Sequence, residues 1–309
     1  MMRAPLMTRS TLTRSVACAI ACAGLSIFTR GAAAQIMSAP ATPNATSGTA
    51  LTDWNISYRM PANWRVGQTI GRLQMIVSNT DAGMIFLAPG MYATPQDAIA
   101  DLSTLYQQMQ MQMQAYPVEQ PAMGTIAGLR SITAMYASAD QMGRMVQGRY
   151  IALLTAHGTG VSLLAMTTQD KMATLRTTLD QLAASVKAEA PSVNRQAMAA
   201  LAGQWILYDG KVDPVTTSSG GASHSYEETV VFDGQGSYRW SSASQVSVTT
   251  PGISAGAGSA NGSTTDGDQG SYTVIGNTLV LKGTKGQLAV DFQLGNGQLI
   301  AAGKRYVRQ

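Results

Sequence analysis

The side chains that could do acid–base or nucleophilic chemistry are few and scattered. The two histidines, His157 and His224, lie far apart, and neither has a second histidine at the spacing of a zinc site. His157 begins a glycine-containing stretch typical of an exposed turn. His224 lies near Ser223, Ser225 and Glu227, but neighbouring residues of a strand point to opposite faces, so they do not form a catalytic triad. We expect no catalytic residue, with a hydrolase that uses His157 or His224 as an alternative.

Methionine offers a second chemistry, because thioether sulfur is a soft ligand suited to Cu(I). Met109, Met111 and Met113 alternate with glutamines. On a helix Met109 and Met113 share a face while Met111 points roughly 160° away, whereas in a strand all three share one face. A copper-handling or soft-metal-handling protein would need the three sulfurs together and exposed. The competing interpretation is that these methionines pack in a core, and we expect no cofactor.

Two glycine-containing stretches could bind ions but lack the context for it. The stretch 252–262 does not join a strand to a helix, as a phosphate-binding loop does, and it predicts a flexible loop. Asp266 and Asp268 alternate with glycines, yet the rest of a twelve-residue calcium loop is missing. The stretch 266–270 therefore predicts a polar hairpin loop.

The first 34 residues have the pattern of a secretory signal. Arg3, Arg9 and Arg14 precede the short apolar stretch 16–28, and three alanines at 32–34 fit a cleavage site. This apolar stretch is too short to span a bilayer. We predict a signal peptide over 1–34 and export to the periplasm or the cell exterior.

Removal of this segment changes both the thiol content and the charge. Cys18 and Cys22 fall inside it, and neither follows a leucine three positions earlier, which disfavours a lipid anchor. Arginines of the same segment account for the formal net charge of +4, so residues 35–309 are neutral. A neutral chain gives no electrostatic reason to bind nucleic acid or anionic lipid. We expect no nucleic-acid partner and no stable membrane insertion.

Composition divides the rest of the chain. Residues 35–50, rich in alanine, proline, threonine and serine, predict a flexible leader. Residues 51–190 are rich in methionine and alanine, whereas 200–309 are rich in glycine, serine, threonine and valine and contain no methionine. We predict two domains over these ranges, joined by a linker at 191–199.

The first domain reads as strands, a helix, strands and a second helix. Strands are predicted at 55–58, 65–68, 73–78, 84–88, 126–137, 145–156 and 161–167. Thr94 to Asp97 has the chemistry of a helix start, with proline at the first helical position, and this helix is expected to end near Tyr116 and Pro117. A second helix follows Thr168. This order predicts an α+β domain in which helices pack on an antiparallel sheet.

Three features of this domain resemble the Mog1/PsbP-like fold of exported bacterial proteins. They are the sequence Tyr-Arg-Met-Pro-Ala-Asn-Trp at 58–64, an apolar strand ending at Pro89 and Gly90, and a late strand containing Gly160 before a capped helix. The resemblance implies a binding or assembly module rather than an enzyme.

The second domain is all strand. Nine stretches are predicted, at 204–208, 226–232, 236–242, 245–249, 270–275, 278–281, 288–294, 299–302 and 305–307. Merging the third with the fourth gives eight strands, enough for a small closed barrel. Gly203 and Trp205, with arginines near the chain end, resemble the opening and closing motifs of lipocalin-like barrels. The resemblance implies that Arg305 or Arg308 stacks on Trp205 and closes one end.

Aromatic residues of this barrel are predicted to line its interior or rim and to bind a ligand. They are Trp205, Tyr226, Phe232, Tyr238, Trp240, Tyr272 and Phe292. Ordinary core packing is the alternative, since side chains alone can fill an eight-stranded barrel. Our leading hypothesis is a non-enzymatic exported protein that binds a small apolar ligand or another envelope protein. The barrel type also suggests protease inhibition by an inserted terminal segment.

Overall fold

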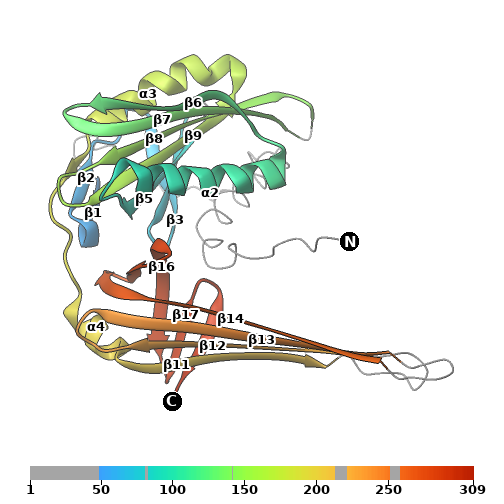
Figure 1. The fold of residues 1–309 in the computed structure, drawn as a ribbon. Coiled ribbons are helices and arrows are strands. Elements are labelled where there is room, and N and C mark those ends of the chain that lie inside the picture. Colours follow the sequence, from blue (N-terminus) through green and yellow to red (C-terminus); the bar gives the residue numbers. More distant parts are fainter. Residues whose placement is uncertain (1–48, 81–82, 141, 213–220, 251–257) are drawn as a thin grey trace. The chain divides into compact units, whose positions relative to one another are not determined.

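The computed structural model describes residues 49–80, 83–140, 142–212, 221–250 and 258–309 (Figure 1). The chain divides into two compact units, Met1–Val193 and Asn194–Gln309. The predicted signal peptide, with its two cysteines, and nearly all of the predicted leader lie outside the described residues. No described helix has the length and apolar character needed to cross a membrane.

An antiparallel sheet of seven strands forms the centre of the first unit, in the order β3-β4-β5-β9-β8-β7-β6. Its strands are β3 (Trp64–Ile70), β4 (Leu73–Ser78), β5 (Met84–Met91), β6 (Tyr116–Ile126), β7 (Leu129–Ala139), β8 (Met145–Leu154) and β9 (Thr159–Thr168). Helix α2 (Pro95–Met113) packs on one face and α3 (Met172–Ala184) on the other (Figure 1). The central strands are therefore buried on both sides.

A smaller sheet completes this unit, in the order β1-β2-β10. The remaining elements are β1 (Thr49–Leu51), η1 (Thr52–Trp54), β2 (Ile56–Tyr58), η2 (Gln169–Lys171) and β10 (Lys187–Ala188). Antiparallel pairing throughout, with helices packed on the sheet, confirms the predicted α+β class.

Helix α2 begins where the sequence predicts and ends earlier. The Thr94 side chain accepts from the Asp97 backbone N–H, and the Asp97 carboxylate accepts from the Thr94 backbone, which forms a capping box. The helix ends at Met113, because Gln114 takes a left-handed conformation with φ of 52°. The expected end at Tyr116 and Pro117 was wrong, since β6 begins at Tyr116. This edge strand is exposed along nearly its whole length, so it lacks the alternation that identifies strands.

Eight antiparallel strands close into a barrel in the second unit. They are β11 (Gly203–Val212), β12 (Gly221–Phe232), β13 (Ser237–Thr250), β14 (Gly258–Ile275), β15 (Thr278–Gly283), β16 (Gly286–Gly295), β17 (Gln298–Ala301) and β18 (Lys304–Arg308). Each strand pairs with the next, and β18 returns to pair with β11. The predicted up-and-down barrel is confirmed, including the merging of two stretches into β13.

Strand β14 starts before the point that the sequence predicts. Residues 258–262 were expected in a glycine-rich loop and 266–270 in a hairpin loop, but both belong to β14. The ladder between β13 and β14 runs from Ser237 opposite Ser271 to Thr250 opposite Gly258. Its backbone hydrogen bonds outweigh the weak strand propensity of glycine, asparagine and aspartate. Residues 251–257 lie outside the described residues.

Helix α4 (Arg195–Leu201) precedes the barrel, within and beyond the segment expected as a linker. The Asn194 side chain caps this helix by accepting from the Ala197 backbone N–H at 2.9 Å. Ala197 and Met198 pack against the barrel core. Residues 195–199 are therefore part of the second unit.

Candidate functional site

Trp205 of β11 is buried in the core of the barrel. This side chain is 1% exposed, and its Nε1–H donates to the carbonyl of Leu201 at 2.7 Å. The Arg308 guanidinium lies over the indole, with Cζ 5.5 Å from the ring centroid, and donates to the carbonyl of Ala202. Of the two arginines considered from the sequence, Arg308 lies on Trp205. Arg305 is exposed and precedes the inward-facing Tyr306, so it points outward.

Four of the other predicted aromatics belong to the same barrel core. Phe232, Tyr238, Tyr272 and Phe292 are each at most 7% exposed. The rings of Phe232 and Tyr272 meet edge to face, with centroids 4.8 Å apart. Aliphatic side chains of β14, β15 and β16 complete the same cluster. These predicted ligand-binding aromatics therefore take part in the packed core of the barrel.

The remaining two predicted aromatics, Tyr226 and Trp240, belong to a polar group that we call the Glu228 cluster. Glu228 is fully buried, at 0% exposure. Its Oε1 accepts from Trp240 Nε1 at 2.6 Å and from the Tyr306 hydroxyl at 2.7 Å. Its Oε2 accepts from the Tyr226 hydroxyl at 2.6 Å and from the ammonium of Lys304. Both carboxylate oxygens are therefore held by two donors each.

The cluster keeps its carboxylate ionised and its phenols protonated. Burial opposes ionisation of Glu228, but the hydrogen bonds from Lys304, Tyr226, Tyr306 and Trp240 outweigh burial and lower the pKa of this carboxyl group. Burial and the neighbouring carboxylate raise the pKa of the Tyr226 and Tyr306 hydroxyls. A buried ion pair between Glu228 and Lys304, with three neutral donors around it, is the result.

Sequence reasoning missed Glu228, Lys304 and Tyr306, although a signal was present. In β12, Glu228 lies at the same alternate positions as Val230 and Phe232, so all three residues face the core. A carboxylate at an inward position of a barrel strand needs donors inside the barrel, because an unpaired buried charge is costly.

A second polar group lies beside the Glu228 cluster, at the turn between β15 and β16. The Lys285 ammonium is 5.3 Å from the ring centroid of Trp240 and pairs with Asp266. The backbone N–H and the hydroxyl of Thr284 donate to Asp268 Oδ1 at 2.9 and 2.7 Å. We call Trp240, Asp266, Asp268, Thr284 and Lys285 the hairpin-tip site. Trp240 belongs to both groups, with its N–H on Glu228 and its ring against Lys285.

Asp266 and Asp268 both have hydrogen-bond partners within the chain. The Tyr238 hydroxyl donates to Asp268 Oδ2 at 2.8 Å. Among the described residues, no group of three or more His, Cys, Asp or Glu side chains could hold a metal ion. The hydrogen bond from Lys285 lowers the pKa of Asp266. Bonds from Thr284 and Tyr238 outweigh burial and lower that of Asp268.

Helix α2 separates the three methionines that were considered for a soft metal. Met109 is 3% exposed and faces the sheet, whereas Met111 is 74% exposed. Met113 is partly buried against the core. The requirement that the three sulfurs lie together and exposed is not met, because residues two apart on a helix diverge.

The histidines lie in different surroundings. His157 is exposed in the turn between β8 and β9, where its backbone N–H donates to Thr155 Oγ1 at 3.2 Å. His224 belongs to strand β12, and its side chain is outside the described part of the structure.

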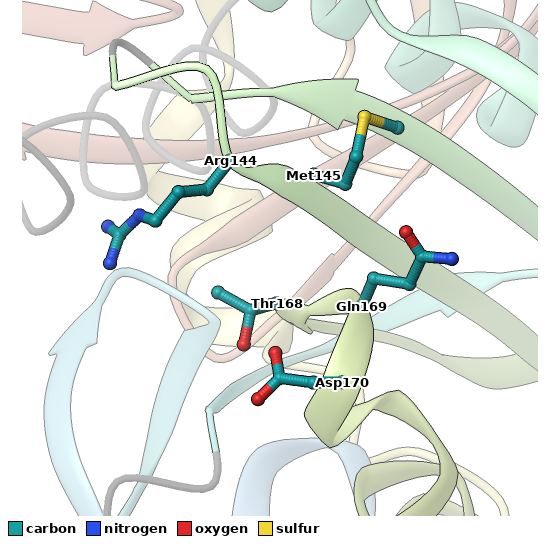
Figure 2. A pocket seen from close by; sticks show the side chains of 5 residues that line it. All are labelled: Arg144, Met145, Thr168, Gln169 and Asp170. Atoms are coloured by element: carbon teal, nitrogen blue, oxygen red, sulfur yellow. The ribbon is translucent and has the colours of Figure 1, made fainter.

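An open pocket of about 610 Å³ lies in the first unit. It is lined by Arg144, Met145, Thr168, Gln169 and Asp170 (Figure 2). Figure 2 shows the Arg144 guanidinium directed away from Thr168 and Asp170. Arg144 Nε instead pairs with Asp140 at 2.7 Å, and a hydrogen bond with Thr168 lowers the pKa of Asp170. Arg144 and Asp170, the charged residues of this pocket, thus interact with residues that are close to them in the sequence.

Fold and site together define a protein with an α+β unit followed by a closed up-and-down barrel that contains a buried ion pair. No protein-family model matches the chain, and no curated protein is significantly similar to it in sequence.

Solved structures similar to the chain include two small domains. LpqN, involved in cell envelope biogenesis of Mycobacterium tuberculosis, is 13% identical with a TM-score of 0.33, over 43% of this chain and 82% of its own. Cyanobacterial PsbP from Synechocystis sp. PCC 6803 is 14% identical with a TM-score of 0.35, over 50% of this chain and 99% of its own.

A third similar structure is the di-domain ARO/CYC BexL of the BE-7585A biosynthetic pathway. It is 8% identical with a TM-score of 0.17, over 62% of this chain and 85% of its own. Likeness at these levels assigns neither a ligand nor a reaction.

Proposed function

We propose that this protein is a non-enzymatic, exported binding protein, which contacts its partner through the polar end of the barrel, the name we use for the hairpin-tip site and the adjoining Glu228 cluster. The observation that carries the proposal is the position of Trp240. Its N–H is bonded to the buried Glu228, while its ring, only partly buried, faces the solvent-accessible Lys285. A rigidly held aromatic ring at the edge of a polar cluster is the arrangement that binding sites use.

The filled interior favours contact from outside the barrel over transport of an apolar ligand within it. Phe232, Tyr272 and Phe292 pack against one another and against aliphatic side chains. A ligand inside would have to displace them from a close-packed core, which costs several buried contacts. Of the two partners considered from the sequence, another envelope protein that contacts the surface is therefore preferred. From the predicted signal peptide, we expect this contact in the periplasm or outside the cell.

The test is native mass spectrometry of the mature chain after exposure to an extract of its own compartment. We expect a retained non-covalent mass that is absent from the denatured protein and lost in Trp240→Ala. The matched control is Tyr208→Ala, because Tyr208 is 69% exposed on β11 of the same barrel. A mass that Trp240→Ala retains as the parent does, or no retained mass at all, would overturn the proposal.

A further inference from the structure

We propose that the hairpin-tip site binds an organic ammonium group, a primary amine on an apolar chain, in the place that Lys285 occupies. This inference rests on the proposed function, since it names the chemistry that the polar end of the barrel recognises.

Lys285 shows which chemistry the site accepts. Its ammonium lies on the ring of Trp240, at 5.3 Å from the centroid, and pairs with Asp266. An aromatic face with a carboxylate beside it is the arrangement that stabilises ammonium ions, through the ring quadrupole and the opposite charge.

The barrel contains the same arrangement a second time. The Lys304 ammonium is 5.3 Å from the ring centroid of Tyr226 and pairs with Glu228. Trp240 joins the two arrangements, because its N–H is bonded to Glu228. Two ammonium groups of the chain itself thus occupy two neighbouring aromatic and carboxylate sites.

The two ion pairs differ in solvent exposure, so the Lys304 pair is fixed whereas the Lys285 pair can be exchanged for a ligand. The side chains of Lys304 and Glu228 are 18% and 0% exposed, whereas those of Lys285 and Asp266 are 46% and 51% exposed. An exposed ion pair contributes little to stability, because water screens it and two long side chains lose freedom. Lys285 is therefore able to leave Trp240 without unfolding the barrel, and the ring and carboxylate remain in place.

The charge of the site then determines which ligand can take the place of Lys285. Once Lys285 leaves, Asp266 and Asp268 face the site on the same side of β14, two residues apart. Thr284 and Tyr238 hold the Asp268 carboxylate in position. Two carboxylates beside an aromatic face repel anions and attract a cation, and the indole accommodates the methylene groups of its chain.

The test is isothermal titration calorimetry of the full mature chain with cadaverine as the probe. Lys285→Ala removes the internal competitor, so we expect cadaverine to bind about two- to fivefold more tightly. Asp266→Asn is expected to weaken binding about fivefold. Lys282→Ala is the matched control, because Lys282 lies on β15 of the same hairpin, exposed and facing outward, and should leave the affinity unchanged. No gain in affinity for Lys285→Ala, or an equal gain for Lys282→Ala, would overturn the inference.

Two further titrations distinguish the source of the amine. Tighter binding of cadaverine than of Nα-acetyl-lysine amide indicates a free polyamine, and the reverse indicates a lysine side chain of a protein partner. Glutarate, of similar length and opposite charge, should not bind, and its binding would contradict the ammonium chemistry. Failure of both amines, with a native mass that Trp240→Ala still loses, would reject the ammonium and leave the proposed function standing.

Discussion

Arg308 lies over the indole of Trp205, with Cζ 5.5 Å from the ring centroid, and so fastens the last strand of the barrel to the first. The backbone ladder at this seam is short, since β11 and β18 pair at two positions, Trp205 with Arg308 and Ile206 with Val307. The side-chain contact and the bond from Arg308 to the Ala202 carbonyl supplement a seam with few backbone hydrogen bonds.

Arg308→Ala should therefore destabilise the barrel by about 1–2 kcal/mol, through loss of the cation–π contact and of one hydrogen bond. Urea unfolding followed by tryptophan fluorescence measures this change. The matched control is Arg305→Ala, which removes an exposed, outward-facing arginine of the same strand and should stay within about 0.5 kcal/mol of the parent. Equal effects of the two substitutions would show that Arg308 does not secure the seam.

The Glu228 and Lys304 pair should be strongly coupled. Glu228→Leu leaves the ammonium of Lys304 without its partner, so we expect a loss of about 3–5 kcal/mol in the free energy of unfolding. The double variant Glu228→Leu with Lys304→Met removes both charges and should lose less than the two single variants added together. Simple additivity, measured by the same urea unfolding, would mean that the two charges do not interact.

Stability of the barrel should depend on pH through Glu228. The folded state lowers the pKa of this group from its ordinary 4.5, so its contribution is present above about pH 4.5 and is lost as the pH falls through the folded value. Asp266 and Asp268 act in the same direction. Glu228→Gln should be less stable than the parent at neutral pH and show a shallower decline between about pH 5 and pH 3.

Urea midpoints measured across this pH range check the prediction. Asp53→Asn, in the other unit, is the control and should leave the pH dependence of the barrel transition unchanged. A decline as steep in Glu228→Gln as in the parent would assign the acid sensitivity to other carboxylates.

Gly283 allows Asp268 and Tyr238 to approach each other at the polar end of the barrel. A Cβ on Gly283 would lie 2.1 Å from Asp268 Oδ2 and 2.3 Å from the Tyr238 hydroxyl oxygen. Gly283→Ala should therefore separate these two groups and destabilise the barrel by about 1–3 kcal/mol, measured by thermal unfolding. Gly295→Ala adds the same methyl group where no atom lies within 4 Å, and it serves as the control. A Gly283→Ala variant as stable as Gly295→Ala would contradict this close approach.

Much of the architecture follows from local patterns in the sequence. The apolar stripe of α3 and the capping residues Thr94 and Asp97 of α2 predict helices, because helix periodicity and end chemistry are local properties. The alternation and turn residues of the second domain predict eight strands for the same reason. Strand β6 and the first part of β14 could not be predicted from the sequence, because neither has an alternating apolar face. Both depend on a neighbouring strand for their hydrogen bonds.

Local patterns in the sequence were enough to predict which residues are helical or extended over most of the described chain, and which aromatics belong to the barrel. Tertiary structure decided that Arg308 rather than Arg305 lies on Trp205, and that Glu228 meets Lys304 and Tyr306 inside the barrel. Local periodicity cannot supply these contacts, because Glu228 and Tyr306 are brought together by closure of the barrel. A buried carboxylate is stable when strands that are distant in the sequence place hydrogen-bond donors around it. Which donors it meets depends on strand order and register rather than on the neighbouring residues in the sequence.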